Sequence, residues 1–223
     1  DDWNGTETLT FMVDDSQGRA VATDDIDVVV TPVNDEPVLS DISNQETTED
    51  MPLVITLEAT DVDEDELTFS ATSEYPEDVA VEVIGSQLTL TPADNWYGAV
   101  NILVTVSDGF LTDDTTFVLT VTPVNDTPTI DLPDSLTFDE DGSLVEDFSG
   151  FMDDIDEDDL TLSVSDTMNV TVTIDGFDVT FGSVQDFNGT ETLTFTVNDN
   201  QGRAIASDDV DVIVTPVNDA PIL

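Results

Sequence analysis

The chain has 223 residues, of which 52 are acidic and only two are basic, so its formal charge is −50. It contains no Cys, His or Lys, which excludes disulfides, the soft ligands of zinc and the usual bases that activate a catalytic Ser. We therefore expect no enzyme. Nucleic acid and anionic membranes are poor partners, because they are bound through clustered Lys and Arg, whereas cations are natural partners.

Neither a membrane span nor a leader is predicted. No apolar run approaches the roughly 18 residues that a membrane-spanning helix needs, so we expect no direct membrane insertion. Nothing at Asp1 resembles a signal peptide. The sequence is therefore expected to lie inside a longer protein.

One short ending occurs three times. Val33-Asn34-Asp35 recurs as Val124-Asn125-Asp126 and as Val217-Asn218-Asp219, at intervals of about one sandwich domain. Residues 1–39 and 185–223 are identical at 28 of 39 positions, and the middle copy is more diverged, which indicates two alternating repeat types. The spacing predicts the last two strands of one repeat at 1–35, a complete repeat at 36–127, and a complete repeat with its following linker at 128–223.

The first segment is predicted to be a hairpin with one apolar face. Its inward residues are Leu9, Phe11, Val13, Ile26, Val28 and Val30. Two strands alone cannot cover such a face. Either a domain is interrupted here, or the hairpin finds partner strands in another chain, and the sequence leaves both possibilities open.

Alternating patterns predict seven strands in the middle repeat, near 38–47, 53–59, 67–72, 79–84, 87–91, 99–107 and 114–122, with a tight turn at Gly85-Ser86. The inward residues of the last two strands are Ile102, Val104, Val106, Phe117, Leu119 and Val121, and those of the last repeat are Leu193, Phe195, Val197, Val210, Val212 and Val214. The predicted fold class is all-β, with tandem seven-stranded Greek-key, immunoglobulin-like sandwiches arranged end to end as a rod.

The segment Thr31-Pro32-Val33-Asn34-Asp35-Glu36-Pro37 resembles the linker between cadherin domains, in which an Asn-Asp pair helps to bind calcium. Asp61-Val62-Asp63 resembles the paired aspartates at the end of the second cadherin strand, and Asp108 resembles the aspartate that ends the sixth. Glu49 resembles the glutamate near the end of the first strand. The pattern is closest to the bacterial cadherin-like repeats of large extracellular adhesins.

The resemblance implies shared calcium sites at each linker. The implied ligands are Asn34, Asp35, Glu49, Asp61, Asp63, Asp94 and Asp108 around the middle repeat, and Asn125, Asp126, Glu140, Asp154, Asp156, Asp199, Asn218 and Asp219 around the last one. Calcium takes six to eight oxygens, more than one loop easily provides, so two neighbouring domains are expected to share an ion. The chain has Pro92–Trp96 where cadherins carry Asp-Arg-Glu, and only Asp94 could substitute, so fewer than three ions per linker are expected.

Simpler interpretations compete with these sites. In a chain this acidic a single Asp is usually solvated surface, and it is the recurrence of the positions that favours ligands. An EF-hand is rejected, because Thr72 and Ser165 stand where its loops require Glu. Trp3, Trp96 and Phe187 occupy matching positions and are interpreted as structural plugs at the sandwich end.

The leading hypothesis is a calcium-dependent, non-enzymatic structural and adhesion module: a rigid extender in a large bacterial surface adhesin of biofilm type, extracellular and at the cell surface. Its partners would be calcium ions and neighbouring repeats of the same chain. The alternative is a carbohydrate-binding module of a secreted polysaccharide-acting protein, with Trp96-Tyr97 or Tyr75 as the platform. Homophilic contact is a third possibility, which the charge opposes unless calcium bridges the partners.

Overall fold

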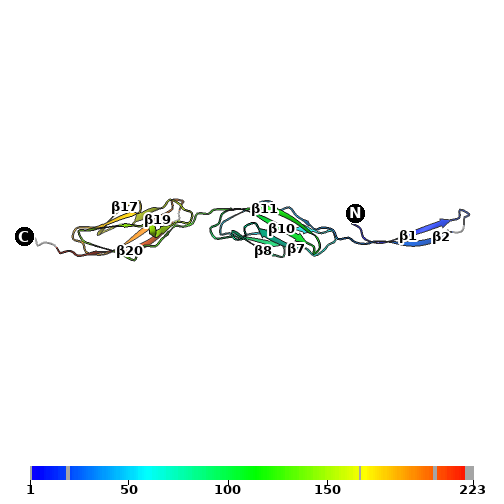
Figure 1. The fold of residues 1–223 in the computed structure, drawn as a ribbon, viewed down its shortest axis with the longest axis horizontal. Coiled ribbons are helices and arrows are strands. Elements are labelled where there is room, and N and C mark those ends of the chain that lie inside the picture. The colour runs from blue at the N-terminus through cyan, green and yellow to red at the C-terminus, as the bar shows by residue number, and fades with distance from the viewer. Residues whose placement is uncertain (1, 19–20, 166, 203–204, 219–223) are drawn as a thin grey trace, which may run out of the picture. The chain divides into compact units, whose positions relative to one another are not determined.

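The computed structural model describes residues 2–18, 21–165, 167–202 and 205–218 (Figure 1). The chain divides into two compact units, Asp1–Pro123 and Val124–Leu223, and each is described by itself. Among the described residues, no helix is both long and apolar enough to cross a membrane. The architecture is all-β, as predicted.

The first segment forms a two-stranded antiparallel sheet of β1 (Gly5–Asp14) and β2 (Val21–Val30), in which Leu9 pairs with Ile26. The predicted hairpin is therefore present. Its six predicted inward side chains remain exposed, from 39% at Val30 to 70% at Val13. In the described part of the chain, this apolar face has no sheet packed on it.

The middle sandwich has two main sheets. The strands are β3 (Val38–Leu39), β4 (Gln45–Thr48), β5 (Leu53–Thr56), β6 (Ala59–Thr60), β7 (Thr68–Ser73), β8 (Val79–Ile84), β9 (Gln87–Pro92), β10 (Gly98–Ser107) and β11 (Thr112–Thr122). One sheet has the order β4-β11-β10-β7 and the other β5-β9-β8, with a short β3-β6 ladder beside them. The turn at Gly85-Ser86 joins β8 to β9 as predicted, and Gly85 has a φ of 60°, which glycine adopts without strain.

The predicted first strand is wrong in one respect, because it does not run unbroken over 38–47. Val38–Leu39 pairs antiparallel with Ala59–Thr60, whereas Gln45–Thr48 pairs parallel with β11. Between these pieces the Asn44 side chain accepts a hydrogen bond from the Val118 N–H at 3.0 Å, in place of a strand-to-strand bond. The predicted second strand likewise divides into β5 and β6. In each case the two pieces of the predicted strand pair with different neighbouring strands.

The core of the middle sandwich lies between its sheets. All six inward residues predicted for the last two strands are buried, and they pack with Leu57, Val79, Leu88 and Leu90. Outward neighbours such as Leu103 stay partly exposed, which is the alternation expected for an antiparallel sheet with one buried face. The period-2 pattern therefore predicted the core correctly.

The last sandwich repeats this plan. Its elements are β12 (Thr129–Ile130), β13 (Ser135–Asp139), β14 (Ser143–Asp147), the 3₁₀ turn η1 (Ser149–Phe151), β15 (Met152–Asp153), β16 (Thr161–Val164), β17 (Val170–Asp175), β18 (Asp178–Ser183), β19 (Gly189–Asn198) and β20 (Ile205–Thr215). The sheets are β13-β20-β19-β16, β14-β18-β17 and β12-β15. All six predicted inward residues of β19 and β20 are buried, and Phe148 and Phe181 complete an aromatic core.

Candidate metal centre

At the start of the middle sandwich, the linker residues are held by acidic side chains. The Asn34 amide donates to the Asp108 carboxylate at 2.8 Å and to the Asp35 carbonyl at 3.0 Å. The Asp35 backbone N–H donates to the Asp63 carboxylate, also at 2.8 Å. Residues from the linker, from the loop after β6 and from the end of β10 therefore meet at one end of this sandwich.

The loop after β6 brings three carboxylates together. Asp61 Oδ1 accepts the backbone N–H groups of Asp63 at 2.8 Å and of Asp65 at 3.4 Å, and Glu64 takes a left-handed φ of 62° that closes the turn. One oxygen from each of Asp61, Asp63 and Asp65 lies within 4.8 Å of the others. Asp61 Oδ2 is buried and has no hydrogen-bond partner among the described residues. Such an oxygen is costly unless a cation satisfies it.

The last sandwich has the same arrangement. The Asn125 amide donates to the Asp199 carboxylate and to the Asp126 carbonyl, both at 2.8 Å, and the Asp126 N–H donates to Asp156 at 2.7 Å. Asp154 Oδ1 accepts the N–H of Asp156 at 3.0 Å. The linker again joins the acidic loop to the end of a long strand.

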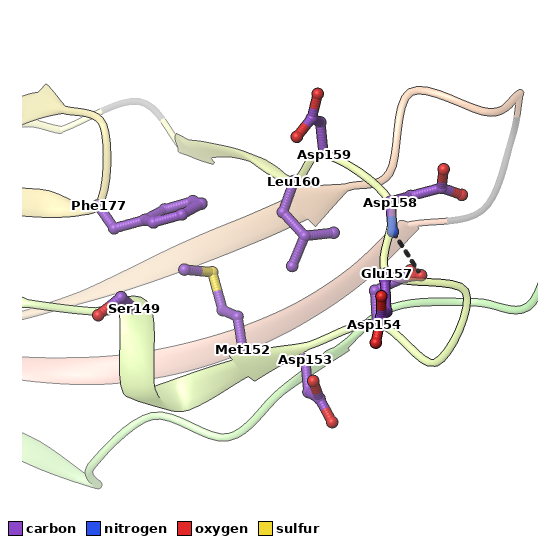
Figure 2. A pocket seen from close by; sticks show the side chains of 9 residues that line it. All are labelled: Ser149, Met152, Asp153, Asp154, Glu157, Asp158, Asp159, Leu160 and Phe177. Carbon is purple, nitrogen blue, oxygen red and sulfur yellow. Dashed lines mark hydrogen bonds between the residues drawn. The ribbon is translucent and has the colours of Figure 1, made fainter.

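The acidic loop of the last sandwich is the better buried of the two. One oxygen from each of Asp154, Asp156 and Asp158 lies within 4.8 Å of the others. Asp154 is only 9% exposed, and its Oδ2 is buried without a hydrogen-bond partner in the described parts of the chain. Figure 2 shows the Asp158 N–H directed at Asp154, a contact of 3.3 Å to Oδ1. Backbone donors therefore hold one oxygen of Asp154, and the other oxygen has no donor among the described residues.

The aspartates that end β10 and β19 are kept ionised by their donors. The Asn34 amide, helped by the backbone N–H groups of Leu111 and Phe110 at 2.6 Å each, lowers the pKa of Asp108 below its ordinary value. The Asn125 amide and the Gln201 N–H lower the pKa of Asp199 in the same way. Hydrogen bonds to a carboxylate favour its charged form. Both groups are thus anionic acceptors at neutral pH.

Two more predicted ligands, Glu49 and Glu140, directly follow β4 and β13 in their own sandwiches. Glu49 and Glu140 are 2% and 5% exposed, and their backbone N–H groups bond to the carbonyls of Thr122 and Thr215 at the ends of β11 and β20. The Glu140 carboxylate accepts the Asn188 amide at 3.1 Å and the Val217 N–H at 2.6 Å. Asn188 precedes β19 and Asp199 follows it, so Glu140 lies at the opposite end of the last sandwich from Asp154.

Three predicted calcium ligands remain to be placed: Asp94, Asn218 and Asp219. Asp94 is exposed just before β10, and Asn218 is exposed beyond β20. Asp219 lies outside the described residues. Glu49 and Asp94 belong to one unit and Asp126 to the other, so their joint use in a shared site stays a prediction.

The predicted ligand set leaves out Asp65 and Asp158, the third acids of the two loops. The signal was present, because the spacing Asp-x-Asp-x-Asp recurs in both repeats. The set also leaves out Asp113 and Asp208, whose carboxylates accept the N–H groups of Leu39 at 2.8 Å and of Leu132 at 2.7 Å. Those two aspartates anchor the segment that follows each linker.

A cavity of about 430 Å³ adjoins the acidic loop of the last sandwich (Figure 2). The side chains of Met152, Leu160 and Phe177 form its apolar side, and Asp154 and Asp158 are among the acids on the other side. The pocket is open, and its polar lining carries carboxylates, which favours cations over anionic ligands.

The aromatic residues at the sandwich ends pack on glycine. A Cβ on Gly98 would lie 3.1 Å from the Trp96 ring, and a Cβ on Gly189 would lie 3.3 Å from the Phe187 ring. Both rings are partly buried against their cores, as expected of structural plugs. Tyr75 and Tyr97, in contrast, are 52% and 58% exposed.

Two family models match the chain in tandem. A cadherin-like domain model matches residues 33–122, and a bacterial Ig domain model matches residues 125–215. The chain belongs to the bacterial cadherin-like Ig repeats. Both families consist of non-enzymatic modules, and bacterial Ig domains are typical of extracellular surface proteins. A comparison with curated proteins finds no significant match.

Solved structures support the fold of these repeats. The protocadherin structure PcdhgB3 EC1-4 is 17% identical, with a TM-score of 0.62, over 96% of this chain and 58% of that chain. Human protocadherin-24 EC1-2 is 18% identical, with a TM-score of 0.54, over 82% and 100%. An endo-fucoidan hydrolase of glycoside hydrolase family 107 is also 18% identical over 97% of this chain, with a TM-score of only 0.37. This chain spans about a third of that hydrolase.

Proposed function

We propose that these repeats are a calcium-dependent extender of a large extracellular bacterial surface adhesin of biofilm type. The observation that carries the proposal is the pair of acidic loops, each with a buried carboxylate oxygen on Asp61 or Asp154 that lacks a hydrogen-bond partner among the described residues. A hard divalent cation is the partner that such an oxygen lacks. Function then lies in the length and stiffness of the chain.

The donor set fits calcium. Each cluster offers three carboxylate oxygens, and calcium prefers oxygen ligands over the His nitrogen and Cys sulfur that this sequence lacks. In the last sandwich Asp154, Asp156 and Asp158 would hold the ion. In the middle sandwich Asp61, Asp63 and Asp65 would hold it. The bound ion would supply charge neutralisation and would tie the linker to the loop.

The linker hydrogen bonds support a mechanical role. The Asp126 N–H donates to Asp156, so an ion that fixes the Asp156 carboxylate also fixes the chain that enters the sandwich. Without the ion, several carboxylates at the linker repel one another. The linker is then expected to bend more freely, and the calcium-loaded linker to be stiff.

Small-angle scattering tests this proposal. Wild-type protein in millimolar calcium should give a narrow, extended distribution of interatomic distances, and chelator should broaden it. Asp154→Asn with Asp156→Asn keeps side-chain size but removes two charges, so this double variant in calcium should scatter like the chelated wild type.

The matched control is Asp175→Asn with Asp178→Asn, which removes the same charge from exposed positions at the β17–β18 turn of the same sandwich. This control should scatter like wild type in calcium. If the two double variants behave alike, calcium acts only by screening the charge of −50, and the proposal of specific sites fails.

Carbohydrate binding is the weaker alternative. Trp96 is packed against Gly98 and the core, which leaves Tyr75 and Tyr97 as the exposed aromatics of the middle sandwich. An extender should bind nothing on a glycan array, whereas a carbohydrate-binding module should bind a polysaccharide and lose it in Tyr75→Ala or Tyr97→Ala.

A further inference from the structure

The β1–β2 hairpin and the β19–β20 hairpin share one register. Gly5 pairs with Val30 as Gly189 pairs with Val214, and the two ladders stay in step through all ten pairs. Their inward residues are the same at every position except Ile26, which corresponds to Val210. In the last sandwich this face is buried, whereas in the first hairpin it is exposed.

One carboxylate distinguishes the last sandwich from the middle one. Glu191 accepts the backbone N–H groups of Met168, Asn169 and Val170 at 2.6, 2.7 and 2.9 Å. The first hairpin carries Glu7 at this position.

The middle sandwich carries no glutamate at the position of Glu191. It carries Val100 at the corresponding position, 2% exposed and part of the core. Its corresponding loop is already bonded internally, because the N–H groups of Asp78 and Val79 donate to the Tyr75 carbonyl at 3.1 and 3.0 Å. A glutamate placed there would be buried without those donors, which is costly.

The Phe195 ring also distinguishes the last sandwich from the middle one. The Phe195 ring lies 5.1 Å from the Phe148 ring and 6.1 Å from the Phe181 ring, measured between centroids. The first hairpin carries Phe11 at the position of Phe195, whereas the middle sandwich carries Val104. The hairpin therefore carries both the acid and the ring that suit strands of the last-repeat type.

We propose that the apolar face of the first hairpin binds the other strands of a sandwich of the last-repeat type, equivalent to residues 126–184, supplied by polypeptide joined in front of Asp1. In that sandwich Glu7 receives three loop N–H groups and Phe11 enters an aromatic cluster. A second copy of this chain is a poorer source, because its own β19–β20 hairpin already covers the surface and exchange would bury no additional apolar area. The proposal does not depend on calcium binding.

Two extended proteins of equal length test it. The first places a copy of residues 126–184 in front of Asp1, and the second places residues 35–93 there, which span the same part of the middle repeat in the same number of residues. Amide hydrogen exchange of residues 5–30 is measured in both and in the 223-residue chain. We expect exchange in the first protein to slow by at least about 100-fold, to the level of β19–β20, and to slow much less in the second.

The variant Glu7→Val supplies a crossed control. It should speed the exchange of residues 5–30 in the first extended protein, where the loop donors lose their acceptor, and slow it in the second, where valine matches Val100. The proposal is overturned if both extended proteins protect the hairpin equally, or if neither does. It is also overturned if the 223-residue chain already protects the hairpin in a concentration-dependent way, since a second copy would then be the partner.

Discussion

The variant Asp154→Asn is predicted to have opposite consequences in chelator and in calcium. Asparagine keeps the oxygen that accepts the Asp156 and Asp158 N–H groups, but replaces the buried Oδ2 with an amide donor. The ligand oxygens of the cluster lie within 4.8 Å of one another, and at that distance two like charges repel by about 1 kcal/mol in water-like surroundings and by about 3.5 kcal/mol at an effective dielectric constant of about 20. Removing one carboxylate should therefore stabilise the metal-free sandwich by about 2 kcal/mol.

Calcium should reverse the advantage. An extracellular calcium module with a dissociation constant of about 10⁻⁴–10⁻³ M gains about 1.4–2.7 kcal/mol per site in 10 mM calcium. The variant has lost a ligand and should gain little. Calorimetry in chelator and in calcium, with hydrogen exchange of β19 and β20 to report on the last sandwich, measures both shifts. Asp175→Asn is the control.

Two results would refute this reasoning. If Asp154→Asn destabilises the last sandwich in chelator, the buried oxygen is not repelled by its neighbours and must be satisfied by some other group. If its calcium-induced shift equals that of wild type, Asp154 is not a ligand.

Three other perturbations follow from single contacts. Asn125→Ala should raise the pKa of Asp199 towards its ordinary value, which carboxyl ¹³C NMR titration measures, and an unchanged pKa would show that other donors dominate. Burial raises the pKa of Glu191, but the three N–H donors outweigh burial and bring the pKa below its ordinary value of 4.5. The ionised carboxylate therefore stabilises the fold above pH 4.5, and this stabilisation is lost on acidification. Glu191→Gln should thus cost about 2 kcal/mol at pH 7, and a thermal-melting gap from wild type that does not narrow below pH 4 would contradict this. Gly98→Ala should destabilise the middle sandwich by about 2 kcal/mol, because Gly98 has a φ of 153° and the new Cβ would press on the Trp96 ring. An unchanged melting temperature, measured by tryptophan fluorescence, would contradict the role of Trp96 as a structural plug.

Much of the fold could be predicted because alternation directly encodes which side chains face the core. Ile102, Val104 and Val106 alternate with polar or exposed neighbours, and each is buried. The division of the first strand could not be predicted, because residues 38–47 carry no pattern that separates the ladder with β6 from the ladder with β11. That choice depends on strands distant in sequence.

The candidate centre was predicted in part. Asn34, Asp61 and Asp108 were recognisable because equivalent residues recur at a constant spacing, and the structure brings them to one end of a sandwich. The unpartnered oxygen of Asp61 depends on a loop conformation that no spacing encodes. Glu191 resembled one more surface acid in an acidic chain, although its repetition as Glu7 was visible.

Calorimetric titration of the 223-residue protein with calcium tests the central claim most directly. The account predicts saturable binding with a dissociation constant of about 10⁻⁴–10⁻³ M, and a loss of sites when Asp61→Asn is combined with Asp154→Asn. The variant that combines Asp114→Asn with Asp175→Asn removes the same charge from exposed positions of the two sandwiches and should bind as wild type does. If wild-type binding does not saturate, or if both double variants lose affinity equally, calcium is only a diffuse counterion of an acidic chain.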